Sequence, residues 1–293
     1  MSGIRLFHAG GLIARFICLS GFSLSVAAAC PVSGVTTVGV VPQQAASDLA
    51  QDWIPLLREL SAMSGCEFRF ATAPTIPEFE KRLSRSEYDI AYMNPYHYVV
   101  FNKAPGYVAF AREKDRKLRG LLVVRADSKI SSVAELAGRE VVFPSPAAFA
   151  ATVIPLAELA KSGVNVKPRF VASHDSVYLN VTRGFAAAGG GIERTLESIA
   201  PEVKADLRVI WRSAEYPPHA FARLPSLPEA IGEVFVGSMQ KLSLTPQGKD
   251  MLARISFKGV VAAPDSDWDP VRALDIRVLD SLLAQPVESG STR

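Results

Sequence analysis

Short buried strand patterns alternate with helical patterns along this chain, and that alternation restricts its fold more than any other feature. Residues 36–41 form an apolar strand pattern, and from 47 to 63 apolar residues recur at helical spacing. The strand pattern 67–71, the helical pattern 76–84 and the strand pattern 88–92 follow. This order predicts an α/β fold with mainly parallel sheets.

A second series of the same kind follows. Strand patterns occupy 121–124, 140–143, 166–171, 185–189 and 207–211. Ser132 and Glu135 have the spacing of a capping box, and Gly138 is a typical stop signal. We expect a helix over 148–162 and two helices after Trp211, so the chain contains two βα blocks and a helical C-terminal section.

The first 29 residues have the composition of an export signal. They include Arg5 and Arg15, no acidic residue, and an apolar run over 16–29 that ends in three alanines before Cys30. This run is shorter than the ~20 residues that a membrane-spanning helix requires. We therefore expect residues 1–29 to be a cleaved signal peptide and the mature chain to be periplasmic, with an uncleaved anchor as the alternative.

Charge and residue spacing argue against several functional classes. Removing Arg5 and Arg15 lowers the formal net charge from +3 to +1, and no basic stripe interleaved with aromatic residues suggests nucleic acid. The mature histidines, His97, His174 and His219, lie far apart and lack the spacing of a metal site. No nucleophile elbow or phosphate-binding loop is present. We therefore expect no enzyme activity, metal or cofactor.

Two cysteines remain after export, Cys30 and Cys66. Each precedes a predicted strand, and these two strands should be neighbours, so a disulfide is possible in an oxidising compartment. Alternatively, Cys30 is the lipidated first residue of a lipoprotein, or both thiols are free.

Several segments, in order, resemble the phosphate-, phosphite- and phosphonate-binding proteins of ABC importers, a branch of the type II periplasmic binding fold. The resemblance rests on Tyr88–Tyr98, 126–143, His174–Val177, Trp211–Pro217, Leu244–Gly248, 258–260 and 267–272. Each segment alone is a weak signal, but together they span nearly the whole mature chain.

The resemblance implies two α/β lobes that close on a ligand at the carboxyl ends of their strands. The expected organisation is lobe 1 over 30–120, lobe 2 over 121–210, a return to lobe 1 over 211–284 and a disordered tail over 285–293. Such a protein is expected to be a monomer that captures a small anionic ligand for an ABC permease in the inner membrane. A ligand-sensing module for a histidine kinase is the alternative, because both roles need the same closing cleft.

In lobe 1, the turn after the strand 88–92 supplies tyrosine rings, hydroxyls and an amide in quick succession. We expect Tyr92, Asn94 and Tyr96 to form one wall of the cleft, with His97 and Tyr98 behind them. Gln44, just after the first strand, is a further candidate contact.

In lobe 2, the sequence departs from the pattern that it resembles. The relatives have Ser-Thr-Ser-Gly at a helix start, whereas this chain has Ala148-Phe149-Ala150-Ala151, followed by Thr152. The hydroxyl groups are lost, but backbone N–H groups at a helix start can still bind an oxyanion. Phe149 suggests an additional apolar contact.

The resemblance also implies that His174 donates a hydrogen bond to the ligand, with Ser176 beside it at a helix start. Ala187 stands where aminoalkylphosphonate binders have an aspartate, which argues against a ligand with an ammonium group. After the glycine run 189–191, Arg194 could replace the lost hydroxyls by clamping an oxyanion.

Overall fold

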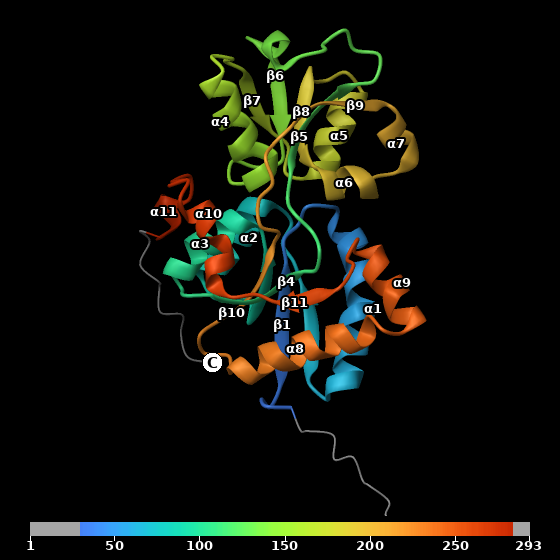
Figure 1. The fold of residues 1–293 in the computed structure, drawn as a ribbon, viewed down its shortest axis with the longest axis vertical. Helices are drawn as coiled ribbons and strands as arrows, with labels where there is room; N and C mark the ends of the chain where they lie inside the picture. Colours follow the sequence, from blue (N-terminus) through green and yellow to red (C-terminus); the bar gives the residue numbers. More distant parts are fainter. Residues whose placement is uncertain (1–29, 284–293) are drawn as a thin grey trace, which may run out of the picture.

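The computed structural model describes residues 30–283, so the expected signal peptide and the whole of the expected tail lie outside the described residues. Within this range the chain forms two α/β lobes, each built on its own sheet (Figure 1). No helix among these residues has the length and apolar character needed to cross a membrane.

Lobe 1 is built on a six-stranded sheet of order β11-β4-β10-β3-β1-β2. Strand β1 is parallel to β2 and β3, whereas β10 runs antiparallel to β3 and β4. Its strands are β1 (Val35–Val40), β2 (Glu67–Ala71), β3 (Ile90–Met93), β4 (Val108–Glu113), β10 (Ala220–Arg223) and β11 (Val260–Ala262). Its helices are α1 (Ala46–Ser64), α2 (Ile76–Ser84), α3 (Pro95–Lys103), α8 (Glu229–Leu242), α9 (Pro246–Arg254), η3 (Asp265–Trp268), α10 (Asp269–Arg272) and α11 (Asp280–Leu283).

Lobe 2 is built on a five-stranded sheet of order β7-β6-β8-β5-β9. Its strands are β5 (Gly120–Arg125), β6 (Glu140–Phe143), β7 (Lys167–Phe170), β8 (Ala188–Ile192) and β9 (Leu207–Arg212). Its helices are η1 (Val133–Leu136), η2 (Phe149–Val153), α4 (Ile154–Lys161), α5 (His174–Thr182), α6 (Glu193–Ser198) and α7 (Pro201–Ala205). The sheet thus extends from Gly120 to Arg212, and the chain after it returns to the first sheet through β10 and β11.

Two antiparallel segments, 114–119 and 213–219, connect the lobes and together form the hinge. Leu118 and Tyr216 exchange backbone hydrogen bonds of 2.9 Å in both directions. A single two-residue bridge between otherwise irregular segments is the kind of element at which two lobes can rotate.

Three expectations need correction. The sheets are mixed and not mainly parallel, because the strands by which the chain leaves and re-enters a lobe, β4 with β10 and β5 with β9, run antiparallel. The strand expected at 185–189 lies at Ala188–Ile192, because Gly184 and the residues after it form a turn. The capping box of Ser132 and Glu135 is present, but it begins a single 3₁₀ turn and not a longer helix. Helix α1 agrees with the helical spacing over 47–63; it runs unbroken through Pro55 and ends at Gly65, which has the positive φ of 72° that favours glycine.

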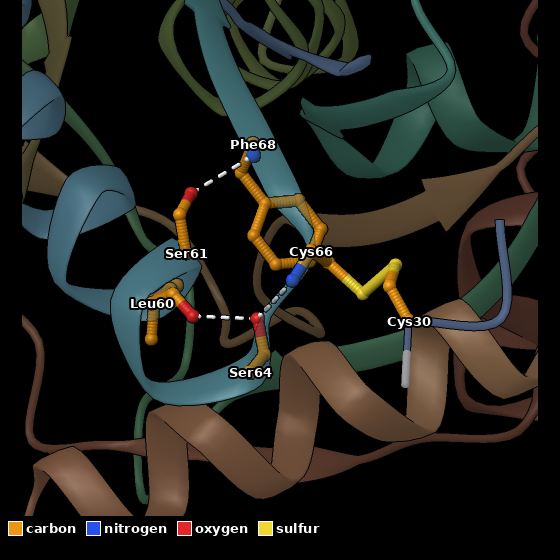
Figure 2. The surroundings of a disulfide bond; sticks show 6 residues. All are labelled: Cys30, Leu60, Ser61, Ser64, Cys66 and Phe68. Atoms are coloured by element: carbon orange, nitrogen blue, oxygen red, sulfur yellow. Dashed lines mark hydrogen bonds between the residues drawn. A yellow bond between two sulfur atoms is a disulfide. The ribbon is translucent and has the colours of Figure 1, made fainter. Parts of the chain in front are cut away.

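A disulfide joins Cys30 to Cys66 at the start of β2 (Figure 2). Nearby, the end of α1 is tied to β2, because Ser61 Oγ accepts the Phe68 N–H at 2.9 Å and Ser64 Oγ accepts the Cys66 N–H at 3.2 Å. The bond closes a loop of 36 residues, for which chain entropy gives a stabilisation of about 4 kcal/mol. Of the three alternatives for these cysteines, the structure favours the disulfide.

Candidate functional site

The candidate site lies between the lobes, where the carboxyl ends of β1 and β3 face η2, α5 and α6. Three small adjoining cavities, of about 20, 20 and 10 Å³, occupy this interface. A cavity needs ~10–15 Å³ to hold one water molecule, so the lobes are closed on each other.

Hydrogen bonds across the interface confirm that the lobes touch. The His174 N–H donates to the Gln43 carbonyl at 3.1 Å, and Asn94 Nδ2 donates to the Ala147 carbonyl at 3.3 Å. Gln44 Nε2 donates to Ser198 Oγ at 3.2 Å. Gln44 borders the first cavity, and its amide reaches the opposite lobe.

Arg194, in the first turn of α6, projects from lobe 2 onto lobe 1. Its Nη1 donates to the Tyr92 hydroxyl at 2.9 Å, and its Nη2 donates to Gln43 Oε1. The guanidinium carbon lies 5.5 Å from the centre of the Tyr92 ring, within the range of a cation–π contact. Arg194 borders two of the three cavities and is the cation that reaches across from lobe 2 to Tyr92 and Gln43.

A buried carboxylate balances part of this charge. Glu113, at the end of β4, is 2% exposed and accepts from Arg116 Nε at 2.9 Å. Burial raises the pKa of Glu113, and the charges of Arg194 and Arg116 oppose that rise.

Tyr92 is held by other aromatic rings at the end of β3. It packs against Trp53 at 5.5 Å, against Phe221 at 4.7 Å and against His219 at 5.2 Å between ring centres. Burial raises the pKa of Tyr92, so its hydroxyl stays protonated at neutral pH and is available as a hydrogen-bond donor.

The turn after Tyr92 separates into residues that face the cleft and residues that do not. Asn94 caps α3 by accepting the His97 N–H at 2.8 Å, and it borders the third cavity. Tyr96 points elsewhere, because its hydroxyl accepts the Leu279 N–H at 2.9 Å. The structure therefore does not support Tyr96 as part of the cleft wall; α3 turns its side chain toward the C-terminal segment.

The two residues expected behind the wall are used inside lobe 1. His97 Nε2 is 2.9 Å from Glu80 Oε1, and both side chains are buried. The hydroxyl of Tyr98 bonds to Asp265 and accepts the Ala109 N–H at 3.2 Å.

The η2 helix forms the opposite wall with backbone and small side chains. Residues 148–151 border the third cavity, and no side chain caps the first N–H groups of the helix. Phe149 contacts Tyr216 of the hinge edge-on, with 5.0 Å between ring centres. Thr152 is fully buried, and its Oγ1 has no hydrogen-bond partner among residues 30–283, but it does not border any of the three cavities.

His174 borders the third cavity at the start of α5. Burial, with a smaller contribution from the charge of Arg194, lowers its pKa to about 3, so the imidazole is neutral at physiological pH. The helix cap is Ser173, whose Oγ accepts the Ser176 N–H at 3.1 Å. Ser176 is thus part of the cap and lies outside the cavity lining.

Sequence reasoning missed several residues of the cleft. His219 borders two cavities, and its buried Nε2 has no hydrogen-bond partner in the described part of the chain. Burial and then Arg194 lower the pKa of His219 well below its ordinary value. Thr195 also lines a cavity, and so does Gln43, the neighbour of the candidate Gln44 after the first strand. His219 and Thr195 had no visible signal in the sequence, because the segment 213–219 and the short helix α6 bring them to the cleft.

In residues 30–283 no group of three or more His, Cys, Asp or Glu side chains is arranged to hold a metal ion. The groups that converge on the candidate site include Arg194, neutral imidazoles, a tyrosine hydroxyl, amides and a helix start. These groups can donate hydrogen bonds and are suited to holding an oxyanion.

Comparison with known proteins agrees with this reading. Residues 38–268 match the family model "ABC transporter, phosphonate, periplasmic substrate-binding protein". The chain is 24% identical to the phosphate-import protein PhnD of Mycolicibacterium smegmatis, over 80% of this chain and 83% of that protein.

Two solved structures share the fold. The binding component of a Pseudomonas aeruginosa ABC phosphonate transporter has a TM-score of 0.77 and 20% identity, covering 88% of this chain and 90% of that one. PhnD1 from Prochlorococcus marinus in complex with methylphosphonate has a TM-score of 0.75 and 18% identity, covering 86% and 99%. The family match spans most of the sequence, both lobes included. The chain therefore belongs to the family of periplasmic substrate-binding proteins of phosphonate ABC transporters, and it is a binding component and not an enzyme.

Proposed function

We propose that this protein binds a small phosphonate or phosphate-like oxyanion between its lobes. The observation that carries the proposal is the convergence of Arg194, the neutral His174 and His219, and the uncapped start of η2 on one closed cleft. A tetrahedral oxyanion offers several acceptor oxygens, and each group named here can donate to one of them.

The charge of the lining supports an anion and not a cation. The third cavity, between η2 and the two histidines, is lined without any carboxylate. Arg194, over the Tyr92 ring, lines the other two cavities. The carboxylates of those cavities are already paired: Asp52 with Arg254, Glu113 with Arg116 and Glu193 with Arg212. A ligand ammonium would therefore meet cations and neutral donors with no free carboxylate to pair with.

Arg194 supports the idea that this chain compensates for its missing hydroxyls. Proteins with the family pattern have Ser-Thr-Ser-Gly at the position of Ala148–Ala151. The present chain instead places the guanidinium of Arg194 at the same cleft from α6. A guanidinium can donate two parallel hydrogen bonds to one oxyanion, which replaces more than one hydroxyl donor.

Ligand entry requires the lobes to open. The cavities of about 10 to 20 Å³ cannot hold an oxyanion, and Arg194 occupies the acceptors Tyr92 and Gln43. Rotation at the Leu118–Tyr216 bridge would separate α6 from β3 and free the guanidinium for the ligand.

The proposal includes export and delivery. The basic and then apolar composition of residues 1–29 supports a cleaved signal peptide. All cleft residues come from one chain, so a monomer is sufficient to bind the ligand and present it to an inner-membrane permease.

The test is calorimetric titration of the mature protein with methylphosphonate, inorganic phosphate, methanesulfonate and acetate. We expect binding of at least one of the first two and no binding of acetate. Arg194→Met should weaken that binding about ten- to a hundredfold, the range for losing a hydrogen bond to a charged group.

Arg212→Met is the matched control, because Arg212 is exposed and pairs with Glu193, the neighbour of Arg194 in sequence. It should bind like the wild type. No heat with either phosphorus oxyanion, or equal weakening by both substitutions, would contradict the proposed function.

A further inference from the structure

Behind His174 lies a chain of buried hydroxyl groups that leads away from the cleft. Thr195 Oγ1 is 3.1 Å from His174 Nδ1, and the Tyr178 hydroxyl is 2.8 Å from Thr195 Oγ1. The three side chains come from α5 and α6 and are at most 2% exposed. We propose that Tyr178 and Thr195 hold His174 in the tautomer that carries its proton on Nε2, so that the neutral ring donates a hydrogen bond into the cleft.

The proposed direction uses each hydroxyl proton along the chain toward His174. Tyr178 and Thr195 each have one hydroxyl proton, and both hydroxyls also lie 3.2 Å from the Ile192 carbonyl. Ile192 is the N-cap of α6, where the carbonyl normally accepts the first bond of the helix. In the proposed arrangement Tyr178 donates to Thr195, and Thr195 donates to Nδ1 at 3.1 Å and not to the Ile192 carbonyl at 3.2 Å, which makes Nδ1 an acceptor. The opposite arrangement, with Nδ1–H donating to Thr195, is what the experiment below distinguishes from it.

A neutral imidazole has one N–H group, so an accepting Nδ1 places the proton on Nε2. Among residues 30–283 no group forms a hydrogen bond with Nε2 of His174, whose ring borders the third cavity. With the opposite tautomer, a lone pair would face the ligand oxygens and repel them. The hydroxyl chain thus converts a buried, uncharged histidine into a donor for an anion.

The glycine run of β8 provides the space for this chain. A Cβ atom on Gly191 would overlap the Tyr178 hydroxyl. The absence of a side chain at this position lets Tyr178 approach Ile192 and Thr195. Gly191 therefore makes room for the hydroxyl chain and does not itself face the cleft.

The inference rests on the proposed function for its effect on binding, but the tautomer can be measured without ligand. Two-dimensional ¹⁵N NMR of ring-labelled protein distinguishes Nε2–H from Nδ1–H. We expect wild-type His174 as Nε2–H. Thr195→Val should abolish that preference and raise the Kd for methylphosphonate about tenfold or more, as expected for a misdirected hydrogen bond to a charged group.

Thr195→Ser is the rescue variant, because it keeps the hydroxyl; it should retain the Nε2–H tautomer and the wild-type Kd. Tyr178→Phe should weaken the preference and raise the Kd severalfold. If Thr195→Val does not fold, the comparison of Thr195→Ser with Tyr178→Phe decides.

An Nδ1–H signal in the wild type, or an unchanged Nε2–H signal in both hydroxyl-deletion variants, would overturn the inference. A wild type that shows Nε2–H but binds no phosphorus oxyanion would support the inferred tautomer of His174 and refute the proposed function instead.

Discussion

The two walls of the cleft differ in the groups that line them, which are aromatic side chains in lobe 1 and mainly backbone in lobe 2. On the side of lobe 1, Tyr92 stands in a cluster of aromatic rings that includes Trp53, Phe221 and Phe257. On the side of lobe 2, the wall is η2 backbone with alanine side chains, backed by the glycines of β8.

The glycines allow lobe 2 to bring backbone against backbone. A Cβ on Gly190 would overlap the Ala151 carbonyl and the Phe143 ring, and one on Gly120 would overlap the Ala150 carbonyl. Strands β5 and β8 therefore lie directly under η2 and fix where its N–H groups point.

This difference separates two ways of presenting polar groups. Lobe 1 fixes side-chain hydroxyls and amides by packing large rings around them, so deleting one polar atom is a local change. Lobe 2 presents backbone donors, whose position depends on an absence of side-chain atoms, so adding one carbon should disturb the whole wall.

The largest expected effect is therefore on the lobe 2 wall. Gly190→Ala should lower the free energy of unfolding by about 3 kcal/mol, because the clash with the Ala151 carbonyl involves backbone that cannot move freely. Urea unfolding measures this loss, and weakened methylphosphonate binding should accompany it.

Gly237→Ala is the control for Gly190→Ala, because a Cβ there meets nothing within 4 Å and Gly237 lies in helix α8. That change should be neutral or stabilise by up to about 1 kcal/mol. Equal stability of the two variants would show that lobe 2 adapts and would remove the contrast between the walls.

A smaller effect concerns the pH dependence of stability. Because the folded-state pKa of His174 is about 3, unfolded His174 binds a proton below pH 6.5 while folded His174 does not. Its stabilising contribution is complete above pH 6.5 and declines as the pH falls, by about 2 kcal/mol between pH 7 and pH 5. His174→Gln should therefore lose less stability than the wild type over this interval in urea unfolding.

Asp175 acts in the opposite direction and must be kept in both proteins. Burial raises its pKa to about 6, so protonation between pH 6 and pH 3.8 favours the folded state. His219 acts in the same direction as His174 and accounts for acid sensitivity that remains in the variant. An identical loss in the wild type and in His174→Gln would mean that His174 is not buried as a neutral ring.

The smallest effect tests the aromatic wall. Tyr92→Phe removes a hydroxyl that can donate to the ligand once the lobes open, so it should weaken oxyanion binding by about fivefold, corresponding to about 1 kcal/mol. Tyr96→Phe leaves the Leu279 N–H unpaired, so it should lower stability by about 1 kcal/mol without changing affinity. Titration and urea unfolding of both variants separate these results; a loss of affinity in Tyr96→Phe would restore Tyr96 to the cleft.

The sequence by itself determined the α/β fold class and much of the order of the elements, although β4, β10 and β11 were not predicted. Periodicity and turn residues are local signals, and they located the strands at 36–41, 67–71 and 140–143 and the helix that starts at η2. The segment after Tyr92 and the substituted helix start at Ala148 were visible for the same reason, since each follows directly from a strand.

Only the tertiary structure decided which side chains meet. Tyr92 and Tyr96 are neighbours in the sequence, yet the start of α3 rotates one into the cleft and the other toward Leu279. Arg194 and His219 enter the cleft because a six-residue helix and a hinge segment orient them, and neither arrangement has a periodic signature. Local patterns determine elements, whereas convergence across a hinge depends on how two separately folded sheets pack against each other.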